Sequence, residues 1–106
     1  MIVAVTANEK SLDARVEGCF GKTRFIFVAD TETKIVKIID NSAFADLKSG
    51  SGIKTAEMVA KLKVKKIAVK EIGVEALEIL KNSNIEVLTE CKGSVIEILD
   101  YFASVK

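Results

Sequence analysis

The sequence predicts an α/β fold built on a five-stranded mixed sheet with three helices. Three strand-like runs come first, and the second and third are separated by only a short polar connection. Segments of helical period then alternate with two further short apolar runs, as in βαβ units. The predicted order of elements is therefore β-β-β-α-β-α-β-α.

The first half of the chain supplies the antiparallel part of the sheet. Ile2–Thr6 is a short apolar run, Arg24–Asp30 is aromatic and β-branched, and Lys34–Asp40 follows the tight connection Thr31-Glu32-Thr33. That connection makes the second and third strands a hairpin. Residues 7–23 and 41–52 are polar and contain glycine, so both are expected to be loops.

The second half supplies the parallel part. A helix is expected from about Ile53, a strand at Lys66–Val69, a helix at Gly73–Lys81 and a strand at Ile85–Thr89. Ser94 and Glu97 have the spacing of a capping box. The apolar residues that follow at i, i+3, i+4 and i+7 predict one buried face of a last helix, made by Val95, Ile98, Leu99 and Phe102.

Right-handed crossovers and the hairpin together predict the sheet order 3-2-1-4-5, with strand two alone antiparallel. This is ribonuclease H-like architecture. At 106 residues, the chain is expected to form a single domain over 1–106.

Composition excludes several classes of protein. The net charge of +1 gives no overall basic field, so nucleic acid is not an expected partner. No apolar run approaches the roughly 20 residues of a membrane span, and the first residues read as a strand rather than a signal peptide. We expect a cytoplasmic protein whose two cysteines are thiols. Lysines do cluster at Lys61, Lys63, Lys65, Lys66 and Lys70, either as a solvated surface or as an anion-binding patch.

The predicted topology brings candidate ligand-binding residues to one edge of the sheet. Open α/β sheets bind ligands beyond the carboxyl ends of their strands, where strand order reverses, here near Asn8 and Lys70. Helix N-termini favour anions. Gly50 and Gly52 would let backbone approach a ligand, or would only shape a turn, and Lys22 and Lys54 would add positive charge.

Cys19 and Cys91 are the candidate metal ligands in a chain without histidine. Cys19 lies in a glycine-flanked loop beside Lys22, whose charge would favour the thiolate form that binds metals. A packed or redox-inert thiol is an equally good interpretation. Cys91 adjoins the last strand, where packing is the simpler reading. Two cysteines are too few for a closed zinc or iron–sulfur site. A nuclease reading is disfavoured because the first strand, Ile2–Thr6, carries no acidic residue.

Four motifs in order resemble the dinitrogenase iron–molybdenum cofactor biosynthesis family across nearly the whole chain. They are Glu17-Gly18-Cys19-Phe20-Gly21-Lys22, Gly50-Ser51-Gly52-Ile53-Lys54-Thr55-Ala56, Ile72-Gly73-Val74-Glu75-Ala76 and Gly93-Ser94-Val95. Two departures stand out. Cys19 occupies a position where the family usually has arginine, and residues 41–49 lack the histidines or cysteines that many members carry there.

The resemblance implies a non-enzymatic carrier that transiently binds an iron–sulfur or iron–molybdenum-type cluster or its precursor. Cluster donor and acceptor proteins would be its partners, and the sequence leaves its oligomeric state open. A small-anion or protein-binding regulatory module without metal is the alternative. The candidate cofactor-binding residues are Asn8, Phe20, Gly21, Lys22, Gly50, Gly52, Lys54, Ile72 and Gly73, with Cys19 and Cys91 as metal ligands.

Overall fold

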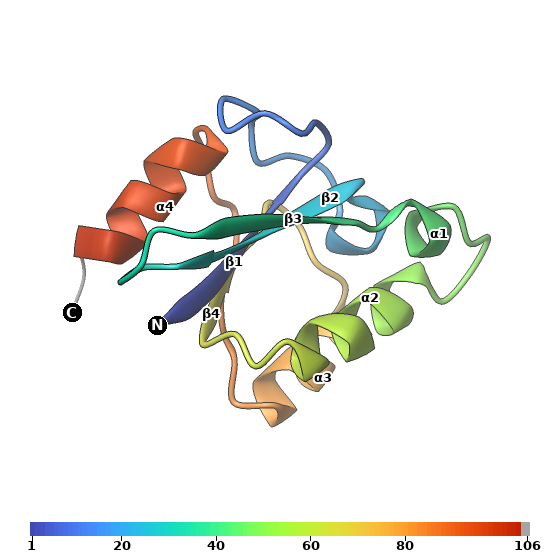
Figure 1. Cartoon of the computed structure of the whole chain (residues 1–106). Coiled ribbons are helices and arrows are strands. Elements are labelled where there is room, and N and C mark those ends of the chain that lie inside the picture. The colour runs from blue at the N-terminus through green and yellow to red at the C-terminus, as the bar shows by residue number, and fades with distance from the viewer. Residues whose placement is uncertain (105–106) are drawn as a thin grey trace.

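A twisted five-stranded sheet in the order β3-β2-β1-β4-β5 forms the centre of the molecule (Figure 1). The computed structural model describes residues 1–104. β2 is antiparallel to both β1 and β3, whereas β4 is parallel to β1 and β5, so the predicted order and directions are confirmed. The strands are β1 (Ile2–Ala7), β2 (Phe25–Asp30), β3 (Val36–Asp40), β4 (Lys66–Ala68) and β5 (Glu86–Leu88).

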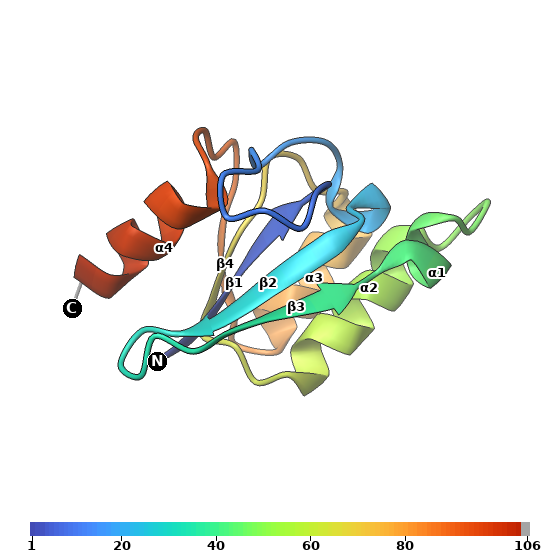
Figure 2. The ribbon, with the colours of Figure 1, turned by 45° about the horizontal axis from the view of Figure 1, so that its top comes forward.

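Helices cover both faces of the sheet (Figures 1 and 2). α2 (Ser51–Lys61) and α3 (Val74–Asn82) pack on one face, and α4 (Val95–Ser104) packs on the other. Alternate residues of β1 point to opposite faces, as in any strand. Val3, Val5 and Ala7 therefore join the α4 side of the core, and Ala4 joins the α2 and α3 side.

Two short helical segments lie in regions that the sequence predicts as loops. η1 (Phe20–Lys22) is a 3₁₀ turn, and α1 (Ser42–Ala45) is a single helical turn. Neither is long enough to show an apolar period, so hydrophobic patterning cannot reveal them. The hairpin strand β3 also begins at Val36 rather than Lys34, since Lys34 has a positive φ of 66°.

The predicted capping box of the last helix is confirmed. The Ser94 backbone N–H donates to Glu97 Oε1 over 3.1 Å, and the Glu97 N–H donates to Ser94 Oγ over 3.3 Å. Within residues 1–104, no helix has the length and apolar character needed to cross a membrane.

Candidate functional site

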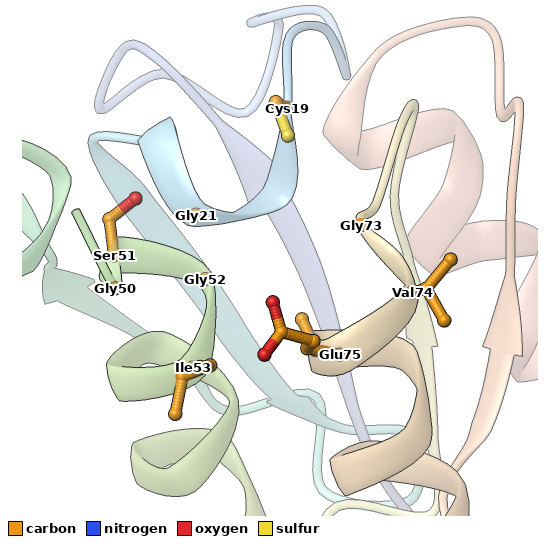
Figure 3. A pocket seen from close by; sticks show the side chains of 10 residues that line it. Cys19, Gly21, Gly50, Ser51, Gly52, Ile53, Gly73, Val74 and Glu75 are labelled. Carbon is orange, nitrogen blue, oxygen red and sulfur yellow. The ribbon is translucent and has the colours of Figure 1, made fainter.

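A cleft of about 280 Å³ opens where η1 meets the first turns of α2 and α3 (Figure 3). It lies at the end of the sheet where β1 and β4 terminate, as the topology rule for open sheets predicts. Three chain segments line it: Cys19 and Gly21, residues 50–53, and residues 73–76. The cleft is therefore built mainly from backbone and small side chains.

Gly21 allows η1 to lie directly on the start of α2. A Cβ atom at Gly21 would lie 2.5 Å from the Gly52 nitrogen and 2.6 Å from its Cα, which no real side chain tolerates. Phe20, only 1% exposed, anchors the same turn in the core between the sheet and the two helices. The turn and the helix thus form one wall of the cleft.

Two helix N-termini face the cleft with glycine as the N-cap of each. The first N–H groups of an α-helix have no acceptor within the helix, and glycine has no side chain to supply one. Gly50 caps α2 with φ 77°, and Gly73 caps α3 in an extended conformation. α4, by contrast, has its Ser94–Glu97 box. The cleft accordingly presents two sets of free N–H donors with the positive ends of two helix dipoles.

Cys19 is exposed, and its sulfur points toward the space between the two helix starts (Figure 3). Its backbone is fixed by neighbouring hydrogen bonds. The Phe20 N–H donates to the Glu71 carbonyl over 2.7 Å, and the Glu71 N–H donates to the Gly18 carbonyl over 3.2 Å. The thiol is thus held at the cleft by an ordered bridge to the chain that follows β4.

Glu75 contributes the one carboxylate among the cleft-lining residues. It lies in the first turn of α3, and Figure 3 shows its carboxylate extending toward the start of α2. An acidic residue in this turn is favoured by the helix dipole. Its negative charge also opposes binding of an anion in the cleft.

A buried pair of polar side chains, Asn41 and Thr55, connects α2 to the turn η1. Asn41 directly follows β3 and is 2% exposed. Thr55 lies within α2 and is fully buried. Asn41 Nδ2 donates to Thr55 Oγ1 over 3.0 Å and to the Thr23 carbonyl over 3.1 Å. Because Thr23 directly follows η1, this pair fixes α2 relative to the turn that carries Gly21.

Five of the candidate residues from the sequence line the cleft together: Cys19, Gly21, Gly50, Gly52 and Gly73. Lys22 lies beside the cleft, but its ammonium donates to the carbonyls of Ala45 and Leu47 over 3.2 and 2.8 Å. It therefore caps the end of α1. Lys54 is exposed, and its Nζ lies 3.9 Å from Glu57 on the same helix.

The other candidate residues have structural contacts outside the cleft lining. Phe20 and Ile72 pack in the core on the side of α2 and α3. Asn8 accepts a hydrogen bond from the Arg24 N–H over 3.1 Å through its Oδ1.

Cys91 belongs to the opposite face of the sheet. It is half-buried against the core that β1 forms with α4, and its Sγ donates to the Leu88 carbonyl over 3.3 Å. Burial raises the pKa of the Cys91 thiol, which keeps it protonated. The structure therefore does not bring Cys91 into the cleft with Cys19.

The cleft also contains residues that sequence reasoning did not select: Ser51, Ile53, Val74, Glu75 and Ala76. A signal for them exists, because all five belong to the two glycine-started helix motifs. Residues in the first turn of a helix that begins at a ligand edge are natural lining residues. The Asn41–Thr55 pair has no such signal, since its partners are distant in sequence.

One known protein family matches nearly the whole chain. Residues 1–105 match the family described as dinitrogenase iron–molybdenum cofactor. The chain belongs to this family. The four motifs that resembled the family therefore reflect real membership, and the cleft of this member lies between three of them. No functionally curated protein matches the chain.

Solved structures agree with the family assignment. The apo form of the orange protein from Desulfovibrio gigas is 28% identical, with 95% of this chain and 85% of that chain covered and a TM-score of 0.88. A putative NifB protein from Thermotoga is 27% identical, with coverages of 96% and 86% and a TM-score of 0.80. A putative dinitrogenase from Methanocaldococcus jannaschii, 17% identical over 94% and 86% of the two chains, shares the fold with a TM-score of 0.63.

Proposed function

We propose that this protein is a non-enzymatic carrier of an iron–sulfur or iron–molybdenum-type cluster, or of a precursor, in cofactor biosynthesis. Family membership and the likeness to the orange protein and to the putative NifB protein support a role connected with such cofactors. The cargo would be exchanged with cluster donor and acceptor proteins. We place this exchange in the cytoplasm, where the free thiols of both cysteines would stay reduced.

The observation that carries the proposal is the convergence of two glycine-capped helix N-termini and one exposed thiol on a single cleft. Metal–sulfur clusters with thiolate or sulfide ligands are anions, and each helix N-terminus carries roughly half a positive charge. Backbone N–H groups donate to sulfur as they do to oxygen. The cleft therefore suits an anion whose surface is made of hydrogen-bond acceptors.

The residues present fit a loosely held cluster rather than a resident one. The chain has no histidine, and within residues 1–104 no group of three or more Cys, Asp or Glu side chains is placed to hold a metal ion. A closed protein site needs three or four ligands. The cargo must thus arrive with its own ligands, and Cys19 would add at most one thiolate. Such weak attachment suits a protein that has to release what it carries.

Anaerobic incubation with a synthetic, thiolate-ligated iron–sulfur cluster tests the proposal. After gel filtration, we expect the protein to retain iron and the visible absorption of the cluster. Wild-type protein that emerges without iron would refute the carrier function. If the wild type binds and Cys19→Ala retains the same amount of iron, only the ligand role of Cys19 fails, and attachment is by N–H groups alone.

The carboxylate of Glu75 in the cleft allows a second test, in which the affinity for the cluster is compared between charge variants. Glu75→Gln removes the carboxylate that opposes an anion, so we expect the cluster to bind up to about fivefold more tightly. Glu78→Gln removes the same charge from an exposed position on the same helix outside the cleft, and serves as the matched control. Equal gains from the two variants would show that the cluster does not bind beside Glu75.

A regulatory module for a small oxyanion is the second candidate, because the cleft offers N–H donors and few metal ligands. A thermal-shift screen of phosphorylated metabolites separates it from the carrier. Stabilisation by such anions, with none by the cluster, would favour this alternative.

A further inference from the structure

The structure contains a second hollow, at the opposite end of the sheet from the cleft. This groove of about 420 Å³ lies over the starts of β1 and β3 and the end of β2, beyond the point where α2 ends. α2 ends at Lys61, and Leu62, the next residue, lines the groove. The groove is lined by Ile2, Val28, Ala29, Asp30, Thr33, Ile35, Lys37, Ile39 and Leu62.

The lining is mainly aliphatic, and part of it is unusually exposed. Ile35 has 60% of its surface exposed at the tip of the hairpin, and Ile2, Val28 and Ile39 are only partly buried. An exposed aliphatic surface within a hollow is typical of a binding site for an apolar group.

Lysines belong to both of the chain segments that border this groove. Lys37 lines it from β3, and Lys34 lies in the adjoining hairpin turn. In the other segment, Lys61 and Lys63 flank the lining residue Leu62 in the chain, and the Lys65 N–H donates to the Ile2 carbonyl over 2.7 Å. Within residues 1–104, no carboxylate lies within 4 Å of any of these five ammonium groups.

Two carboxylates near the groove, those of Asp30 and Glu32, lie close to the positively charged N-terminus. The amino group of Met1 lies 3.7 Å from carboxylate oxygens of both Asp30 and Glu32. Asp30 also accepts the Glu32 backbone N–H over 2.8 Å. The five lysines and the Met1 amino group outnumber the carboxylates of Asp30 and Glu32 around the groove.

We propose that this lysine-flanked groove is a docking site for an acidic, amphipathic segment of a partner protein. Apolar side chains of the segment would enter the groove, and its carboxylates would meet the lysines that border it. A second copy of this chain is a poor occupant, because an isologous contact would set these lysines against themselves. The groove and the cleft lie at opposite ends of the sheet, so a docked partner would leave the cleft open.

Fluorescence anisotropy with three labelled synthetic peptides tests this proposal on the full chain without any cluster. One peptide combines leucine with glutamate, a second combines leucine with lysine, and a third combines serine with glutamate. We expect saturable, salt-sensitive binding of the leucine–glutamate peptide alone. No binding of that peptide, or equal binding of the serine–glutamate peptide, would overturn the proposal.

Variants locate the binding. We expect Lys37→Glu combined with Lys65→Glu to weaken the affinity by at least about tenfold. Lys48→Glu combined with Lys92→Glu changes the net charge equally at exposed positions outside the groove, and we expect less than about a twofold effect. Ile35→Ser, at a position that is 60% exposed, should also weaken binding. Equal losses in the two lysine pairs would overturn the assignment, because only net charge would then matter.

Two competing occupants are distinguished in the same assay. Tighter binding to vesicles of anionic phospholipid than to the peptide, lost in the same lysine variant, would overturn the peptide proposal in favour of a membrane surface. A dimer in sedimentation that dissociates with Ile35→Ser would overturn it in favour of a second copy.

Discussion

Among the glycines that line the cleft, Gly21 has the least room for a side chain. Its Cα lies so close to α2 that any side chain would displace the helix start. Nothing comparable surrounds Gly73, where a Cβ would meet no atom within 4 Å. Both glycines belong to the family motifs, yet only Gly21 is required by steric contact.

Gly21→Ala should therefore lower the free energy of unfolding by about 1–3 kcal/mol, as overpacking does elsewhere. Gly73→Ala should change it by less than about 1 kcal/mol, since the new methyl group meets open space and the backbone conformation suits alanine. Urea denaturation of the two variants measures the difference. Equal losses would contradict the tight contact between η1 and α2.

The two thiols should differ in reactivity. Cys19 is exposed, whereas Cys91 is half-buried, has a raised pKa and donates to the Leu88 carbonyl. Because the thiolate is the attacking form, we expect Cys19 to react much faster with a chromogenic disulfide reagent at neutral pH. Cys19→Ser should remove the fast phase, and Cys91→Ser should leave it. A single phase with equal rates would place both thiols in similar surroundings.

At the scale of elements, the three long helices begin in different ways. α2 and α3 start at glycine, and α4 starts at the Ser94–Glu97 capping box. The Ser94 backbone N–H, together with the Ser94 hydroxyl, holds the pKa of Glu97 below its ordinary value. α4, which does not face the cleft, is thus the long helix in which side chains at its start accept hydrogen bonds from backbone N–H groups.

The capping box should make α4 sensitive to acid. Because the pKa of Glu97 is lower in the folded state than in the unfolded state, its contribution to stability is present above the ordinary glutamate pKa. That contribution is lost as pH falls through the lowered folded-state pKa. Glu97→Gln should therefore be less stable than the wild type near neutral pH, with the difference shrinking in acid. Thermal unfolding across this range measures it, and a difference that stays constant with pH would contradict the ionic cap.

Elements with strong patterning could be predicted from the sequence, and the contacts between them could not. The short hairpin connection and right-handed crossovers predict the sheet order, and the spacing of Ser94 and Glu97 predicts the capping box. The cleft could be placed at the right edge by topology alone. η1, α1 and the Asn41–Thr55 pair could not be predicted, because they depend on tertiary contacts between distant segments. The contacts of the Lys22 ammonium with the carbonyls at the end of α1 likewise join segments that are distant in sequence.

At the scale of the whole molecule, two hollows of different chemistry lie at opposite ends of the sheet. The cleft between η1, α2 and α3 offers N–H groups and one thiol, and the groove beside β3 offers aliphatic side chains and lysines. The first suits a compact anionic cargo, and the second suits an extended acidic chain. A carrier needs both a place for its cargo and a surface for the protein that gives or takes it.

The central claim is that anionic metal–sulfur cargo binds at the starts of α2 and α3. Backbone amide NMR during titration with tetrathiomolybdate, a diamagnetic molybdenum–sulfur anion, tests it most directly. We predict saturable shifts centred on the amides of residues 51–53 and 74–76, with the first turn of α4 unchanged. Shifts centred on the lysines around the groove, or no saturable shifts at all, would contradict it.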